Sequence, residues 1–434
     1  MPASRREASR RDALRLSSGP CYRSLQSLYY GEMNFSTRID FSASRNGLDL
    51  ERGERALKGI PCFDLSQSNP TRTGFAHRPG ELAAALSEEA NALYLPDPKG
   101  LAGARAAIAS HLGKSGRKVD ESRLLLCAST SEAYSYLFKL LCDPGDAVLV
   151  PKPGYPLFDH LASLESVKTL GYKLEYNHPQ GWSIDLDSIR SLLEAPGAGK
   201  ARALVLINPN NPTGSYVHRN ELESIAELCR RHSLALISDE VFHGYFLEPR
   251  EDRVSLLGRD DLLCFVLDGL SKRLCLPQMK LGWIHVSGPE PEAAWAMAAL
   301  ELISDTYLSA GTPIMNGVGA LLAGESDILQ VVRERMKAVL GAYREALCYD
   351  GSPHRILACE GGWTALVQSP RLAGEEELTR GLLREQGLYV HPGFFFDMER
   401  EAYFAFSLIL RPEEARSAAL RYKAYFDKIL KENG

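Results

Sequence analysis

Short apolar runs alternate with helical stretches through the middle of the chain, and this alternation constrains the fold more than any other feature. Stretches with helical periodicity, such as 131–143 and 219–232, separate the runs. Several runs are almost continuously apolar, as strands covered on both faces must be. The pattern predicts a mostly parallel sheet with helices on both sides. The six expected strands are 123–128, 147–153, 203–209, 235–241, 263–270 and 281–288.

The two ends of the chain differ from this middle part. A long helix is expected over 325–348, followed by strands at 360–368 and 403–410. We therefore expect a smaller α+β domain formed by 34–75 and 326–434, and a large domain at 76–325. Residues 1–33 contain six arginines and no apolar core of a secretory signal. We interpret them as a disordered leader; a mitochondrial transit peptide and a true start at Met33 are the alternatives.

Composition and charge exclude several classes of function. A chain of 434 residues with 45% hydrophobic and 24% charged residues is typical of a soluble globular protein. The net charge of −5 gives no basic field for nucleic acid, and no uncharged run is apolar enough for a membrane span. Nine cysteines without a CxxC pair or a Cys/His cluster indicate a reducing, cytoplasmic setting and no metal site.

Polar residues follow five of the expected strands at the point where each strand ends. They are the Ser129-Thr130-Ser131 run, Tyr155, the 208–214 segment, Asp239 and Lys272. Binding sites of open parallel sheets lie at the carboxyl ends of the strands, so these residues are expected to meet. Lys272 also stands among apolar residues, where an amine is costly unless it is paired or its lowered pKa is used.

Three motifs at these strand ends carry a resemblance to a known family. NPNNPTG (208–214), SDEVF (238–242) and GLSK (269–272), in this order, resemble the signature of the fold-type I, class I/II aminotransferases, which use pyridoxal 5'-phosphate. The resemblance covers roughly 65–434. It implies a cofactor-binding large domain with a mostly parallel seven-stranded sheet, a smaller α+β domain, and a homodimer with shared active sites. It also implies transfer of an amino group from an amino-acid donor to a 2-oxo acid.

The resemblance assigns a role to each residue around the cofactor ring. Lys272 would form the Schiff base with the cofactor aldehyde and then move the substrate proton. Asp239 would hold the pyridine nitrogen and Asn211 the ring oxygen, while Tyr155 would stack on the ring face. Ser271, beside Lys272, belongs to the same implied cofactor site.

A second group of residues matches the family's phosphate site. Thr130 and Ser131 begin an expected helix, whose first N–H groups and dipole favour an anion. Lys280 stands where the family usually has an arginine, and a lysine supplies the charge without a bidentate fork. Tyr94 resembles the tyrosine that reaches the phosphate of the neighbouring subunit.

Three departures from the family pattern concern the ring oxygen, the phosphate and the substrate. Phe242 replaces the usual tyrosine donor to the ring oxygen, unless Tyr245 takes its place. Gly269 replaces a common phosphate-binding serine. Ala405 stands where the arginine that binds the substrate carboxylate is expected. Candidate replacements for that arginine are Arg72, beside Asn69 in the SQSNPTRTG segment, and Arg411.

Other functions remain open beside amino transfer. A carbon–sulfur β-lyase, or another carbanion chemistry, uses the same cofactor on the same fold. A regulator that joins this fold to a DNA-binding head would need more than the 33-residue leader. A non-catalytic cofactor binder is compatible with Ala405, although the intact set of Lys272, Asp239 and Asn211 argues against it.

Overall fold

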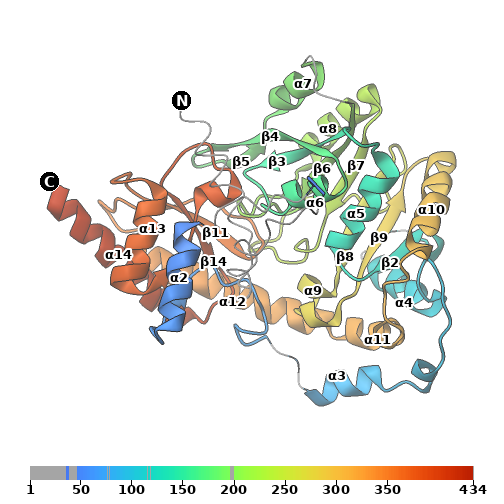
Figure 1. The fold of residues 1–434 in the computed structure, drawn as a ribbon, viewed down its shortest axis with the longest axis horizontal. Coiled ribbons are helices and arrows are strands. Elements are labelled where there is room, and N and C mark those ends of the chain that lie inside the picture. Colours follow the sequence, from blue (N-terminus) through green and yellow to red (C-terminus); the bar gives the residue numbers. More distant parts are fainter. Residues whose placement is uncertain are drawn as a thin grey trace, which may run out of the picture.

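The computed structural model describes residues 36–38, 46–75, 77, 79–114, 116–117, 119–195 and 200–433. Within them, a large sheet with helices on both faces lies beside a smaller sheet, and the long helix α12 (Glu325–Leu347) extends from the smaller sheet to α11 (Thr312–Ala323) (Figure 1). The expected leader at 1–33 lies outside the described residues. In this part of the chain no helix is long and apolar enough to cross a bilayer.

The large sheet has eight strands, one more than predicted. Each of the six expected runs forms a strand, and five neighbouring strands, β8 to β4 in the sheet order, are parallel. The strands β4 and β5 were not among the six expected runs, and β5 pairs antiparallel with β4. Because residues of β4 and β5 alternate between half-buried and exposed positions, neither strand is a continuous apolar run. The order across the sheet is β2 (Leu124–Cys127), β9 (Gly282–Ser287), β8 (Cys264–Gly269), β7 (Ala235–Asp239), β6 (Ala201–Ile207), β3 (Ala147–Lys152), β4 (Lys168–Asn177) and β5 (Gly181–Ile184).

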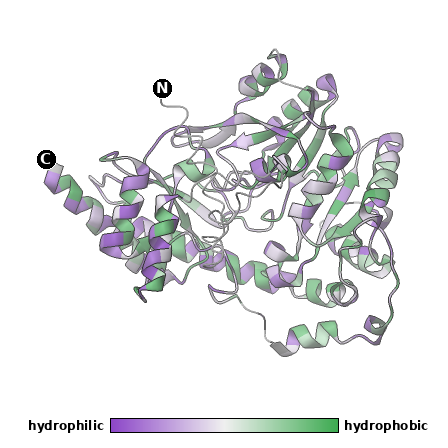
Figure 2. Ribbon diagram, in the orientation of Figure 1, coloured by the Kyte–Doolittle hydropathy of each residue, from purple (hydrophilic) through white to green (hydrophobic). Residues whose placement is uncertain are grey.

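Helices cover both faces of this sheet because each carries one apolar side. On one face lie α5 (Thr130–Leu141), α6 (Phe158–Leu164) and α10 (Glu290–Asp305). On the other lie α7 (Leu186–Glu194) and α8 (Arg219–His232). The helices that cover the sheets carry both hydrophilic and hydrophobic residues (Figure 2). A third cluster joins the β2–β9 end to α3 (Pro79–Leu86), α4 (Ala102–Gly113), α11 (Thr312–Ala323) and the short helix α9 (Leu270–Arg273).

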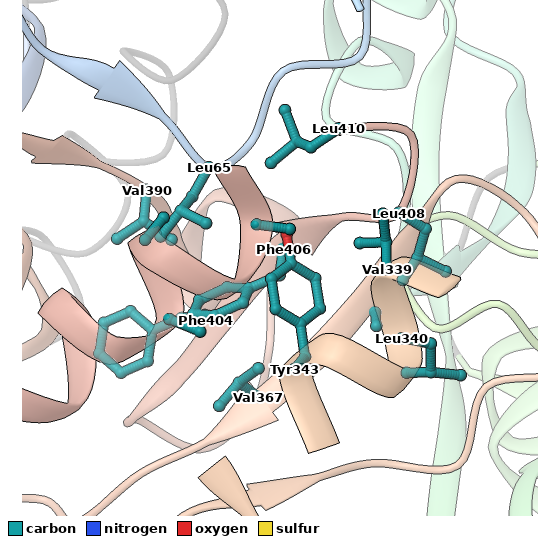
Figure 3. Close-up of a cluster of buried hydrophobic side chains, with 14 of the residues drawn as sticks. Leu65, Val339, Leu340, Tyr343, Val367, Val390, Phe404, Phe406, Leu408 and Leu410 are labelled. Atoms are coloured by element: carbon teal, nitrogen blue, oxygen red, sulfur yellow. The ribbon is translucent and has the colours of Figure 1, made fainter. Parts of the chain in front are cut away.

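The smaller sheet is antiparallel and packs against two long helices. Its order is β10 (Arg355–Ile356), β11 (Thr364–Gln368), β14 (Tyr403–Ser407) and β13 (His391–Pro392). Phe404 and Phe406 of β14 meet Val339 and Tyr343 of α12, and α14 (Pro412–Asn433) completes this core (Figure 3).

An N-terminal segment joins this smaller unit. β1 (Phe63–Asp64) pairs in parallel with β12 (Leu388–Tyr389), and α2 (Gly47–Leu57) packs on α13 (Glu375–Gln386). The remaining elements are the 3-10 turns η2 (Glu89–Ala92), η3 (Glu121–Arg123), η4 (Pro277–Met279) and η5 (Gly393–Phe396).

The smaller unit touches the large one at a glycine crossing. The amides of Glu360 and Gly361 both donate to Gly214 O, at 3.1 and 3.0 Å, and the Gly362 amide donates to Tyr245 O at 2.8 Å. A Cβ at position 361 would lie 2.4 Å from Tyr245 O. The two backbones can therefore approach this closely only because position 361 lacks a side chain.

Candidate active site

The carboxyl ends of β2, β3, β6, β7 and β8 lie at one edge of the large sheet. β2 is antiparallel to β9, and β9 is antiparallel to β8, so β2 runs in the same direction as β8. The polar segments that follow these strands therefore begin at the same edge, as the sequence predicts.

Lys272 lies on α9, beside two aromatic rings that contact each other. Its Nζ is 5.6 Å from the centre of the Phe242 ring and 5.2 Å from that of Trp363. Burial lowers the pKa of Lys272, because the charged amine loses its hydration there. This shift favours the neutral, nucleophilic form of the amine relative to a solvent-exposed lysine.

Tyr245 binds the backbone of α9, the short helix that carries Lys272. Its side chain is fully buried, and its hydroxyl donates to the carbonyls of Lys272 at 2.7 Å and Arg273 at 3.1 Å. A hydroxyl held in this way is occupied by the backbone. Tyr245 therefore does not supply the hydrogen bond that Phe242 lacks.

Asp239 ends β7 as a half-buried carboxylate. Oδ2 accepts a hydrogen bond from the Tyr134 hydroxyl at 3.1 Å, and Oδ1 accepts one from the Val241 amide at 3.2 Å. Burial raises the pKa of Asp239 to about 7, although both hydrogen bonds act in the opposite direction. A carboxylate in such surroundings gains most from a cationic N–H partner.

Two of the three asparagines in NPNNPTG have structural contacts. Asn208 Nδ2 donates to Val254 O at 2.7 Å, and Asn210 Nδ2 donates to Pro153 O at 3.1 Å. The Asn211 side chain has no hydrogen-bond partner among the described residues and is half-buried. Asn211 is therefore the asparagine of this motif that is available to a ligand.

The predicted phosphate-binding residues lie in the first turn of α5. Ser129 caps the helix by accepting from the Glu132 amide at 3.2 Å, so Thr130 and Ser131 occupy the first two helical positions. Their N–H groups have no carbonyl within the helix to bond. Gly282 lies close behind them, because a Cβ there would be 3.1 Å from the Ser129 carbonyl carbon.

Lys280 lies at this edge too, since it comes two residues before β9, and its side chain is exposed. The nearby position 269 requires glycine for a steric reason, because a Cβ there would lie 2.8 Å from Leu281 O. A serine at 269 would force the backbone to move. Ser271, half-buried on α9, is the neighbour of Lys272.

Comparison with known proteins decides the family. Residues 61–419 match the family described as aminotransferase class I and II. The chain belongs to this family. It is an aminotransferase, and it moves an amino group from an amino acid to a 2-oxo acid. The family and its fold use pyridoxal phosphate.

Named relatives and solved structures agree with this assignment. The aminotransferase is 30% identical over 283 residues to the glutamate-pyruvate aminotransferase AlaA of Escherichia coli K12, across 65% of this chain and 67% of AlaA. It is 28% identical over 283 residues to the alanine aminotransferase of Mycobacterium tuberculosis H37Rv, across 64% and 63% of the two chains. Its fold resembles the alanine aminotransferase of Pyrococcus furiosus with a TM-score of 0.80 and 23% identity, covering 91% of this chain and 100% of that one.

Three further sequence-predicted residues of the aminotransferase have exposed side chains. Tyr155 follows β3, is 40% exposed and meets Phe158 edge-on at 6.2 Å. Tyr94 is 75% exposed and lines a shallow pocket with Tyr136 and Leu308. Arg411 lies at the start of α14, where its exposed side chain pairs with Glu414 at 3.9 Å. This surface position gives Arg411 no contact with the lysine helix.

Asn69 and Arg72 share one turn of the aminotransferase. Asn69 Oδ1 accepts from the amide and the hydroxyl of Thr71, at 3.0 and 2.7 Å, so this side chain shapes the turn. Arg72 is exposed and has no side-chain partner among the described residues.

Sequence reasoning missed two residues of this site. Tyr134 contacts Asp239, but it reads as one more apolar residue on the buried face of α5. Trp363 packs beside Lys272 and Phe242. The Gly361-Gly362 pair before it was an available signal, because paired glycines mark a close backbone approach.

Proposed function

We propose that this aminotransferase works with pyridoxal 5'-phosphate attached to Lys272. The observation that supports it most is the meeting of Lys272, Asp239 and Asn211 at one sheet edge. The residues present fit the cofactor: Asp239 is a half-buried carboxylate that forms no ion pair among the described residues, and the Asn211 amide is unengaged among them. Thr130, Ser131, Ser271 and Lys280 would hold the phosphate, and Tyr155 would cover the ring.

The side chains then divide the chemistry. When bound, the cofactor withdraws electrons from the substrate's α-carbon and so makes its proton removable. Lys272 accepts that proton at Nζ and returns it, and burial, which lowers its pKa, favours the neutral amine that this step needs. Asp239 keeps a proton at the ring nitrogen, and Asn211 donates to the ring oxygen. Phe242 and Trp363 exclude water around Nζ.

We also propose a homodimer with shared sites. Tyr94 and Leu95 are exposed by 75% and 62%, and Leu302 and Tyr307 by 72% and 50%. Apolar side chains so exposed favour a covering partner. In that dimer, Tyr94 would reach the phosphate held by the other subunit.

The eight described cysteines are free, which favours a cytoplasmic enzyme.

A single experiment tests the proposed transfer. The protein is loaded with cofactor and given L-glutamate and pyruvate, the pair in the name of its AlaA relative. L-alanine and 2-oxoglutarate in equal amounts support amino transfer. Pyruvate and ammonia from L-cysteine or a cysteine conjugate, without transfer to an acceptor, would instead indicate the β-lyase alternative.

A further inference from the structure

The place of the missing arginine is filled by an apolar cluster. Ala405 is 2% exposed and packs in one cluster with Phe395, Phe396 and Tyr389. The backbone of this aromatic turn is docked on the large domain, because the Gly154 amide donates to Phe396 O at 2.9 Å. A substrate carboxylate placed against these rings would lose its hydration without gaining a partner.

The segment 65–75 runs from Ala405 towards the lysine helix. At its start, Ser66 Oγ donates to Ala405 O at 3.2 Å, and the Ser407 amide donates to Leu65 O at 2.7 Å. At its end, Phe75 is 6% exposed and belongs to the cluster that contains Tyr245, Cys275 and Trp363. The turn at 69–74 therefore lies between Ala405, which stands in place of the arginine, and the residues around Lys272.

This turn is rigid enough to present a side chain. The Arg72 amide donates to Asn69 O at 3.1 Å, and the Phe75 amide donates to Pro70 O at 3.0 Å. Pro70 and Thr73 are buried, whereas Arg72 between them is exposed. The anchors fix the backbone, and the guanidinium is left for another partner.

Other basic side chains near Ala405 and Lys272 already have partners among the described residues. Arg335 donates to Thr73 O and Leu410 O, both at 3.3 Å, and Arg273 pairs with Asp268 and Glu325. Lys152 pairs with Asp397. His391, opposite Ala405 in the sheet, is neutral at physiological pH, since burial lowers its pKa.

We infer that Arg72 binds the substrate's α-carboxylate in place of an arginine at 405, so that carboxylate recognition comes from the N-terminal turn. The inference rests on the proposed function, which supplies the reaction. A guanidinium forms two parallel hydrogen bonds with a carboxylate, and a lysine at the same position would form a weaker, less directed contact.

The test compares substrates that differ only in the carboxylate. L-phenylalanine and 2-phenylethylamine are assayed as donors with wild type, Arg72→Gln and Arg72→Lys, and Arg411→Gln is the matched arginine control. For L-phenylalanine, KM should rise on the order of 10- to 100-fold in Arg72→Gln and less in Arg72→Lys. For 2-phenylethylamine, KM should stay within about twofold, and Arg411→Gln should match wild type.

A binding measurement separates this inference from the proposed function. Propionate, which carries a carboxylate but no amine, should raise the melting temperature of wild type and Arg411→Gln, and not that of Arg72→Gln. Equal KM losses for both donors, an unchanged propionate shift in Arg72→Gln, or loss in Arg411→Gln would each overturn the role of Arg72. Failure of the proposed function shows separately, as absence of cofactor attachment to Lys272 in wild type.

Discussion

The Tyr134 hydroxyl donates a hydrogen bond to Asp239 Oδ2 across 3.1 Å, inside a buried layer between α5 and the end of β7. Phe158 meets the Tyr134 ring edge-on at 4.9 Å and so fixes its direction. The same bond opposes the burial that raises the pKa of Asp239 to about 7. Tyr134 therefore helps to keep Asp239 ionised near neutral pH.

Tyr134→Phe is expected to weaken the hold of Asp239 on the cofactor ring. Without the donor, the pKa of Asp239 should rise further, so less carboxylate is present at pH 7. The cofactor dissociation constant, followed by absorbance against pH, should increase roughly tenfold at neutral pH and recover at alkaline pH. Tyr136→Phe, on the same helix, is the control. A pH profile identical to wild type would contradict the role of Tyr134.

Borohydride reduction of the cofactor-loaded protein is expected to label Lys272. Burial lowers the pKa of Lys272 and so favours its neutral form, whereas Lys280, eight residues later, is exposed. Peptide mass spectrometry should place the adduct on Lys272 alone, and Lys272→Ala should carry none. An adduct on Lys280 would refute the assignment.

Phe242→Tyr is expected to lower the pKa at which the visible spectrum of the bound cofactor changes. A hydroxyl at 242 would stabilise negative charge on the ring oxygen and weaken that oxygen's hold on the neighbouring proton. The spectral titration of both proteins measures the shift. Because the Tyr245 hydroxyl already binds Lys272 O, Tyr245→Phe should leave this pKa in place. A larger change in Tyr245→Phe would reverse the roles of the two positions.

Mixed dimers should reveal the shared site. Tyr94→Phe and Lys272→Ala proteins are unfolded together and refolded, and hybrid dimers should regain one intact site in two. Activity should then exceed the sum of the separate variants, in proportion to the hybrid fraction. If Tyr94 acted within its own chain, the mixture would show only that sum.

Glu325→Gln should lower stability at neutral pH and flatten its acid dependence. Burial alone would raise the pKa of Glu325, but His111 and Arg273 outweigh it and hold the pKa at about 2. The ionised form therefore contributes stability above about pH 4.5, and this contribution is lost as pH falls towards 2. It amounts to roughly 3 kcal/mol.

Melting temperatures between neutral pH and about pH 3 measure the effect of Glu325→Gln. Glu345→Gln is the control, because Glu345 pairs with Arg416 at 3.9 Å on the surface and should contribute little. An equally steep acid dependence in wild type and Glu325→Gln would mean that Glu325 is not ionised in the fold.

The parts of the fold that sequence predicts well are those fixed by burial on both sides. The six apolar runs became strands because water is excluded from both faces of the large sheet. β4 and β5 were not expected, since their half-exposed residues alternate irregularly. Sequence also places Lys272 at the carboxyl end of β8, because the apolar run of that strand ends three residues before the lysine.

Contacts between distant segments could not be predicted in the same way. The Tyr134–Asp239 bond joins residues 105 apart in the chain, and nothing in either segment specifies the other. The burial of Ala405 against Phe395 and Phe396 likewise depends on how the smaller sheet is covered. The sequence shows that Ala405 replaces the expected arginine, but it does not show which residues surround Ala405.

The glycine crossing at 361 is a position that cannot accept other residues, whereas parts of the N-terminal turn can. A library that varies the turn at 69–74 can change the exposed positions 72 and 74, while Pro70 and Thr73 are buried and hold the turn. A library that varies 361 would place each new Cβ 2.4 Å from Tyr245 O, on the residue whose hydroxyl holds Lys272. We expect deep mutational scanning to return glycine alone at 361, and laboratory evolution towards new amino donors to proceed through the N-terminal turn.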